Sequence, residues 1–159
     1  MNECWNYFRY AALDELDEIN DIICSHKKWF SHLKDNHFHK KIIKKECIFE
    51  SGVLITFHFT EKSEQLGDYI VPSGNTILEQ IAVNKKLNKN DYVQHVFTKF
   101  INCSLGELYL AVNKRNLRAI KFYEKMNLNK ISNAKLDYSK ENGFIYYERY
   151  FYFSVGETK

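Results

Sequence analysis

The residues from Leu108 to Leu128 constrain the fold more than any other stretch of this chain. The run Leu108-Tyr-Leu-Ala-Val112 is apolar throughout and predicts a buried strand. A polar turn containing Asn116 follows, and apolar residues then recur at helical spacing up to Leu128. A buried strand that leads straight into an amphipathic helix is typical of proteins in which helices pack on a sheet, so we expect an α/β protein.

Length and composition predict one domain. The chain has 159 residues, 45% of them hydrophobic, and a domain of this size buries roughly 68–70% of the surface that its unfolded chain exposes. It contains one proline and six glycines, which leaves no room for a Pro/Gly linker, and no internal repeat is present. We therefore predict a single domain over residues 1–159.

Targeting signals and cysteines point to an intracellular protein. No apolar run approaches the roughly 20 residues of a membrane span, and the N-terminus lacks the basic-then-apolar order of a signal peptide. We therefore expect a cytoplasmic location. The cysteines form no CxxC pair, so we expect buried reduced thiols rather than a disulfide or a metal site. These cysteines are Cys4, Cys24, Cys47 and Cys103.

Positive charge is concentrated between His26 and Lys45, although the net charge of the chain is only +3. The segment has a single acid, Asp35, and four interleaved histidines. Its surface is suited to an acidic partner or to nucleic acid, because lysines near phosphates gain by counterion release; a solvated helix face explains it equally well. We predict no metal site there, since lysines repel cations and acidic or thiol ligands are missing. The lysines are Lys27, Lys28, Lys34, Lys40, Lys41, Lys44 and Lys45.

Hydrophobic periodicity predicts the remaining helices and strands. Helical spacing predicts helices over residues 13–25, 28–43 with a break near Asp35, and 91–102. In the second helix we expect the lysines and histidines on the wet side, opposite apolar residues that include Phe38 and Ile43. Strands are predicted over residues 46–49, 53–59 after a Ser51-Gly52 turn, 76–83 and 143–153. Together these predict an α/β fold with a mixed central sheet of about six or seven strands, flanked by helices on both faces.

The segment from Leu108 to Leu128 resembles the closing motif of the GCN5-related N-acetyltransferase (GNAT) family. In that motif a strand ending in Val leads through an Asn to a helix that carries Ala and then Phe-Tyr-Glu-Lys, as do Val112, Asn116, Ala119 and Phe122-Tyr-Glu-Lys125. The resemblance covers residues 13–153 and is strongest over 77–128. It implies acetyl-CoA as co-substrate, an N-acetyltransferase activity on a primary amine of an unknown acceptor, and a homodimer through the C-terminal strands.

The resemblance also implies where acetyl-CoA binds. Main-chain groups of Ile81, Ala82 and Val83 match those that hold the pantetheine arm in the gap between two splayed strands. The family's pyrophosphate loop then departs from its pattern, because the leading Arg or Gln is Asn here and both small residues are absent. Its matching positions are Asn88, Lys89, Asn90, Asp91, Tyr92 and Val93. Further cofactor contacts are implied at Asn116, Ala119 and Phe122, and Asn116 is equally suited to cap its helix.

The altered loop leaves two interpretations open. Asp91 is a good N-cap, and its carboxylate would compete with phosphate for the helix amides and repel it. Three lysines, Lys85, Lys86 and Lys89, or left-handed turns at Asn88 and Asn90, would restore binding. In the other interpretation, the loop no longer binds the cofactor.

Amide formation needs a base for the amine and an acid for the leaving thiolate. The resemblance implies Tyr123 as the acid, and aromatic packing at the edge of the core is the alternative. Glu79 is the implied base, directly or through water; a salt bridge to a lysine is its alternative. Strict alternation allows only one of Glu79 and Gln80 to point into the active cleft, and we choose Glu79.

Three functions therefore remain open. The first is an acetyl-CoA-dependent N-acetyltransferase, and the second is a GNAT-like protein that modifies or binds nucleic acid with the Lys27–Lys45 surface. The third is a cofactor-free pseudoenzyme that acts through protein contacts. An acceptor is expected near the first two helices and the last strands, at Trp29, His32, His37 and residues 146–150.

Overall fold

The computed structural model describes residues 3–30, 33, 36–66, 69–86, 90–131 and 150–155. These residues fall into two compact units. The first unit comprises Met1–His58 and Leu78–Cys103, and the second comprises Phe59–Ile77 and Ser104–Lys159. The single domain expected from the sequence stays a prediction.

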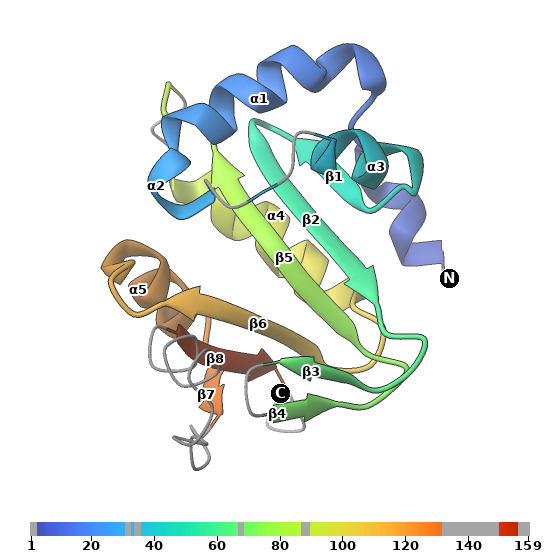
Figure 1. Cartoon of the computed structure of the whole chain (residues 1–159), viewed down its shortest axis with the longest axis vertical. Helices are drawn as coiled ribbons and strands as arrows, with labels where there is room; N and C mark the ends of the chain where they lie inside the picture. The colour runs from blue at the N-terminus through green and yellow to red at the C-terminus, as the bar shows by residue number, and fades with distance from the viewer. Residues whose placement is uncertain are drawn as a thin grey trace. The chain divides into compact units, whose positions relative to one another are not determined.

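Six strands of the described chain form one mixed sheet (Figure 1). Strands β1 and β2 are antiparallel, β5 and β6 are parallel through Thr76 and Ile77, and β8 is antiparallel to both β6 and β7. This confirms the predicted α/β fold with a mixed central sheet flanked by helices. In sheet order the strands are β1 (Cys47–Glu50), β2 (Val53–Phe59), β5 (Thr76–Val83), β6 (Leu108–Asn113), β8 (Tyr150–Val155) and β7 (Asn129–Ile131).

In the first unit, helices pack on both sides of the strands because side chains alternate along β2. On one side, Leu54 joins a buried cluster with Ile19, Phe38 and Ile42. On the other side, Phe57 stacks on Trp5, with ring centroids 5.0 Å apart, and meets Phe100 edge-on at 5.4 Å. The helices are η1 (Glu3–Tyr7), η2 (Leu13–Glu15), α1 (Leu16–Ser25), α2 (Lys27–Phe30), α3 (His37–Ile43) and α4 (Asn90–Cys103).

A disulfide joins Cys4 in η1 to Cys103 at the end of α4, with Cα atoms 5.6 Å apart. The prediction of reduced thiols is therefore wrong for this pair. The two cysteines are separated by 99 positions in the sequence, and only the fold brings them within the reach of a disulfide. Cys47 is buried and Cys24 is exposed, and both are free thiols.

In the second unit, helix α5 (Leu117–Lys125) follows β6, as the Leu108–Leu128 motif predicts. The Asn116 side chain accepts a hydrogen bond from the Ala119 amide at 3.2 Å, which confirms the helix-capping role. Tyr123 on α5 is buried against Phe153 of β8. The sequence did not predict β7 or the short hairpin of β3 (Glu64–Leu66) and β4 (Tyr69–Val71).

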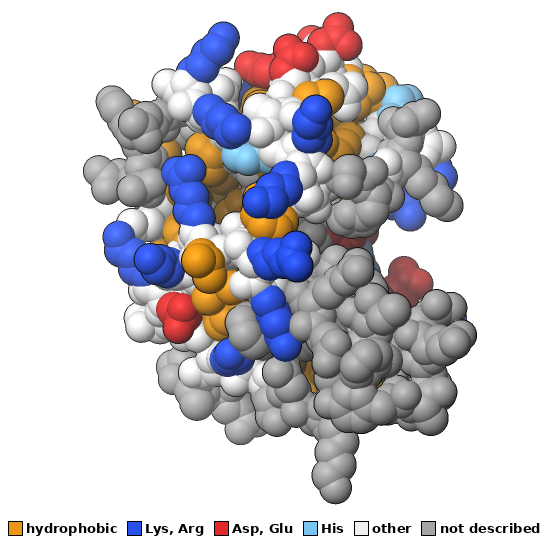
Figure 2. All heavy atoms as spheres, turned by 60° about the vertical axis from the view of Figure 1, so that its left-hand side comes forward, with side chains coloured by type: hydrophobic (Ala, Val, Ile, Leu, Met, Phe, Trp, Pro, Cys, Tyr) orange, Lys and Arg blue, Asp and Glu red, His pale blue; other side chains and the backbone are white. Residues whose placement is uncertain are grey.

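The predicted helix over residues 28–43 is two helices, α2 and α3, and part of its orientation is wrong. Ile43 is 60% exposed, whereas Lys41 turns inward. Phe38 and Ile42, four residues apart, make the buried stripe of α3, and His37 and Lys41 form the next stripe beside it. The other described lysines of this segment are exposed, namely Lys27, Lys28, Lys40, Lys44 and Lys45. Figure 2 shows Lys and Arg side chains spread over one face of the molecule.

Two further boundaries differ from the sequence predictions. Helix α4 begins at Asn90, so Asp91 lies inside the helix and is not its N-cap. Strand β8 ends at Val155 rather than Phe153, and residues 143–149 of the predicted strand lie outside the described chain. None of the helices within the described residues is long and apolar enough to cross a membrane.

Candidate active site

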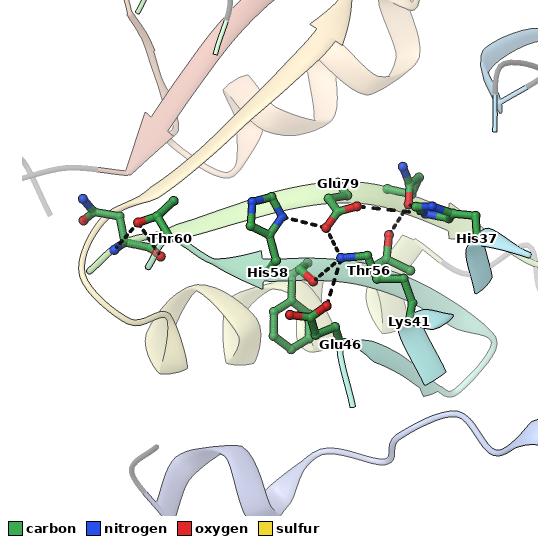
Figure 3. Close-up of polar contacts among 10 residues, drawn as sticks. His37, Lys41, Glu46, Thr56, His58, Thr60 and Glu79 are labelled. Carbon is green, nitrogen blue, oxygen red and sulfur yellow. Dashed lines mark hydrogen bonds and ion pairs between the residues drawn. The ribbon is translucent and has the colours of Figure 1, made fainter. Parts of the chain in front are cut away.

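Glu79, the predicted base, lies near the middle of β5 in the first unit, among polar side chains (Figure 3). We call this group the Glu79 cluster. Its members come from α3, from β2 and β5, and from the residue that precedes β1. They are His37, Lys41, Glu46, Thr56, His58, Glu79 and Gln80.

Lys41 is the most enclosed charged group of the cluster. Its Nζ donates to Glu46 Oε1 and to the Phe57 carbonyl oxygen, each at 3.1 Å, and to Glu79 Oε2. An ammonium group has three donors, so all of its donors have acceptors. Glu79 therefore forms the salt bridge that the sequence left as an alternative to catalysis.

Glu79 also accepts a hydrogen bond from His58 Nδ1, at 2.7 Å from Oε2. Burial by itself raises the pKa of the Glu79 carboxyl, but the hydrogen bonds and charges of His58 and Lys41 outweigh it. The pKa of Glu79 is therefore below its usual range, and the carboxylate is ionised at neutral pH. A carboxylate that already accepts two hydrogen bonds in its ionised form is a weak base, because protonation would weaken both bonds.

Gln80 belongs to the same cluster, which strict alternation does not predict. Its Oε1 accepts from the Thr56 hydroxyl and lies 2.9 Å from His37 Nε2. Because a carbonyl oxygen only accepts, Nε2 of His37 carries a hydrogen. Consecutive residues of β5 thus both contact α3 and β2, so the choice between Glu79 and Gln80 was too restrictive.

Tyr123, the predicted acid, lies in the second unit. Its ring is 5.9 Å from that of Phe153 and 5.8 Å from that of Phe122. The aromatic packing that the sequence left as an alternative is therefore present. Burial raises the pKa of the Tyr123 hydroxyl, which consequently stays protonated at neutral pH. A hydroxyl with a raised pKa is a weaker acid than a free tyrosine, so this burial gives no support to Tyr123 as the acid, and that role stays a prediction.

The predicted cofactor residues are described only in part. Asn88 and Lys89 lie outside the described residues. Asn90 and Asp91 form the start of α4, Tyr92 in the same first turn is 44% exposed, and Val93 is half-buried. The first amides of a helix have no partner within it and bind anions well. Phosphate binding at the predicted loop, which precedes this 14-residue helix, stays a prediction.

On β5, Ala82 is buried in the apolar cluster below α1 and α3, while Ile81 and Val83 are half-buried. The Val83 carbonyl oxygen lies 3.0 Å from His26 Nε2, so that oxygen already has one partner. Lys85 Nζ donates to the Ser25 carbonyl at 2.7 Å, and Lys86 is exposed. Asn116 caps α5, where Ala119 and Phe122 are half-buried.

Of the predicted acceptor residues, Trp29 and His37 are half-buried in the first unit, and His37 is part of the Glu79 cluster. The side chains of His32 and residues 146–150 lie outside the described set. Among the described residues, no group of three or more His, Cys, Asp or Glu side chains is placed to hold a metal ion.

Sequence reasoning missed His58 and Lys41, which both hydrogen-bond to Glu79. A signal was present, since Thr56 and His58 alternate on one face of an otherwise apolar strand, and His37 and Lys41 are one helical turn apart. Their common target could not be read from the chain, because it depends on which strand lies beside β2.

Comparison with known proteins places this geometry in a fold family. No protein-family model matches the sequence, and no curated protein matches it. Solved structures do match it along nearly its whole length. A GNAT-family acetyltransferase from Streptococcus agalactiae aligns with a TM-score of 0.66 at 12% identity, over 96% of this chain and 99% of that one. A GNAT-family acetyltransferase from Bacillus cereus gives 0.64 at 15% identity, over 94% and 96%.

Arabidopsis thaliana NAA60, solved in complex with acetyl-CoA, gives a TM-score of 0.59 at 13% identity, over 96% of this chain and 98% of that one. These identities are low, so the likeness concerns the fold. Coverage is nearly complete on both sides, and the resemblance read from the closing motif is confirmed at that level. The chain has the fold of the GCN5-related N-acetyltransferases.

Proposed function

We propose that the protein is an N-acetyltransferase that transfers the acetyl group of acetyl-CoA to a primary amine. The observation that carries the proposal is the GNAT fold, matched over more than nine-tenths of both chains by GNAT-family acetyltransferases. The acetyl-CoA complex of NAA60 supports acetyl-CoA as the co-substrate. The proposed location is the cytoplasm.

The Glu79 cluster supports this chemistry from the side of the amine. An amine arrives in water mainly as an ammonium ion and must lose protons before and during attack on the thioester. A half-buried carboxylate hydrogen-bonded to an imidazole is suited to bind that cation, and the imidazole–carboxylate pair together is suited to accept its proton. In this proposal Glu79 belongs to the base, and Tyr123 keeps the role of acid for the leaving thiolate that the resemblance implies.

The proposed cofactor contacts follow the family pattern. Main-chain groups of Ile81, Ala82 and Val83 hold the pantetheine arm. The predicted loop at Asn88 and Lys89, with the first residues of α4, binds the pyrophosphate. Lys85 and Lys86 at the end of β5 add positive charge that helps to replace the missing glycines.

Thermal stabilisation by acetyl-CoA tests the proposal without knowledge of the acceptor. A ligand that binds only the native state at about 100 times its Kd stabilises it by about 2.7 kcal/mol, which raises Tm by roughly 5–11 °C for a chain of this size. Millimolar ATP serves as a control for non-specific phosphate binding. We expect acetyl-CoA to raise Tm well beyond ATP.

A pair of charge-reversal variants then locates the pyrophosphate. Lys89→Glu in the predicted loop should reduce the stabilisation by acetyl-CoA, whereas the matched change Lys62→Glu at an exposed position should not. An unchanged Tm of the wild-type protein with every CoA derivative would contradict the proposal and favour a cofactor-free protein.

A further inference from the structure

The Glu79 cluster contains three groups that a transfer reaction could use, and two of them are poorly suited to accept a proton. Lys41 is a cation whose three donors are all engaged by Glu46, Glu79 and the Phe57 carbonyl. Glu79 accepts from both Lys41 and His58, and these donors stabilise its ionised form. Proton transfer to Glu79 would weaken both hydrogen bonds at once.

His58 differs from both in its chemistry. Its Nδ1 lies 2.7 Å from Glu79 Oε2, and an ionised carboxylate has no hydrogen to donate, so Nδ1 carries the hydrogen of this bond. In a neutral imidazole with a hydrogen on Nδ1, the basic nitrogen is Nε2. The carboxylate thus fixes which nitrogen is the base, and it stabilises the imidazolium that forms when Nε2 takes a proton.

Accessibility favours the same residue. The His58 side chain is 26% exposed, against 17% for Glu79 and 13% for Lys41. An incoming amine therefore reaches the imidazole more readily than the groups behind it. His37 is exposed to a similar degree, but its Nε2 contacts the neutral amide of Gln80 at 2.9 Å and lies 4.0 Å from the Glu79 carboxylate.

We propose that His58 is the catalytic proton acceptor of the acetyl transfer, and that Glu79 and Lys41 are its positioning residues. Lys41 holds the carboxylate, and the carboxylate holds the ring. This inference rests on the proposed function and names the atom that performs its proton transfer. It reassigns Glu79 from base to orienting group.

The transfer step forms one bond and breaks another. The amine nitrogen forms a bond to the acetyl carbonyl carbon, and the C–S bond of the thioester breaks, with its electron pair leaving on sulfur. The proton lost by the amine passes to Nε2 of His58, and the thiolate takes a proton from water. His58 then returns to its starting state by exchange with solvent, which leaves an amide and a free thiol.

Kinetics against pH test the assignment. The probe reaction is thiol release from acetyl-CoA with spermidine, kanamycin and a lysine-containing peptide with a free α-amine as acceptors. We expect His58→Gln to lower kcat/KM by about 100- to 10,000-fold, the usual share of general acid–base catalysis, and to abolish the acid limb of the pH profile. The matched control is His95→Gln, at an exposed position of α4, which should keep the wild-type kcat/KM and the acid limb.

Glu79→Gln separates a base from a positioning residue. If Glu79 orients the ring, this variant keeps an acid limb but moves it to lower pH, because a neutral amide no longer favours the imidazolium. If Glu79 is itself the base, Glu79→Gln loses the acid limb and His58→Gln keeps it. That second result overturns the inference. The titratable neighbours that face this pair in the described first unit are His37 and Lys41 on α3 and Glu46 ahead of β1.

A measurement on the unaltered protein guards against variants that fail to fold. Ring-nitrogen NMR of the wild-type chain identifies the tautomer of neutral His58, and we expect the hydrogen on Nδ1. A hydrogen on Nε2 instead overturns the inference whatever the variants do. Wild-type protein that neither transfers acetyl to any acceptor nor gains Tm with acetyl-CoA contradicts the proposed function itself, whereas active wild-type protein with unaffected His58→Gln contradicts only the role of His58.

Discussion

The two faces of β2 carry different kinds of side chain. On one face Phe57 packs with Trp5 and Phe100, and this side is aromatic and dry. On the other face, Thr56 and His58 enter the Glu79 cluster. Apolar burial stabilises a fold at about 25 cal/mol per Å², whereas buried ion pairs add little over apolar side chains of the same size. Leu54 lies on the same face as Thr56 and His58 and joins the apolar cluster of α1 and α3, so only part of that face is polar. We call the part with Thr56 and His58 the polar face, and we expect it to contribute less to stability than the aromatic face.

The aromatic face should show the largest single-residue effect. Phe57 is 1% exposed and touches two rings, so Phe57→Ala should lower the free energy of unfolding by about 3–5 kcal/mol through lost transfer energy and a cavity. Urea unfolding measures this change. Tyr7→Ala, at a ring that is 73% exposed, should stay within about 0.5 kcal/mol. Equal effects at the two positions would contradict the assignment of the core.

The disulfide on the same face should rank next. Replacing Cys4 and Cys103 together by Ser releases a crosslink between residues 99 positions apart, and we expect a loss of about 2–4 kcal/mol because the unfolded chain gains freedom. Cys24→Ser, at an exposed free thiol, is the matched control. If the double variant and the control melt together, the crosslink does not form in solution.

The polar face should respond differently, because its groups depend on one another. Lys41→Met leaves Glu79 and Glu46 without their shared cation, at a site that is only partly open to water. We expect a loss of about 2 kcal/mol, less than for a fully buried pair. Lys40→Met, exposed on the same helix, should have an effect within about 0.5 kcal/mol.

A double variant sharpens this result. If the loss in Lys41→Met comes from a stranded carboxylate, adding Glu79→Gln should recover part of it. Strictly additive losses would show that the two side chains act separately, and the cluster would then be a set of local contacts.

The sequence predicted those features of β2 and its neighbours that depend on local residues, and it missed those that depend on contacts between distant segments. The bounds of β2 and β5 match their predictions to the residue, because apolar and β-branched runs with a Ser51-Gly52 turn are local signals. The hairpin of β3 and β4 was missed because its strands have three residues each and include polar positions. The roles of Lys41 and His58 were missed because they depend on α3, β2 and β5 meeting in space.

The smallest expected effect is a pH dependence that belongs to the polar face alone. The pKa of Glu79 is raised by burial but lowered more by His58 and Lys41, so its folded value lies below its unfolded value. A carboxyl of this kind adds stability at pH values above its unfolded pKa, and this stability disappears as the pH falls through the folded pKa. The free energy of unfolding of the wild-type protein should therefore fall more steeply below about pH 4 than that of Glu79→Gln. Phe57→Ala alters no titrating group, so its stability curve should run parallel to that of the wild type. Parallel curves for Glu79→Gln as well would mean that Glu79 has the same proton affinity in the folded and unfolded chains, and the electrostatic contrast between the two faces of β2 would be lost.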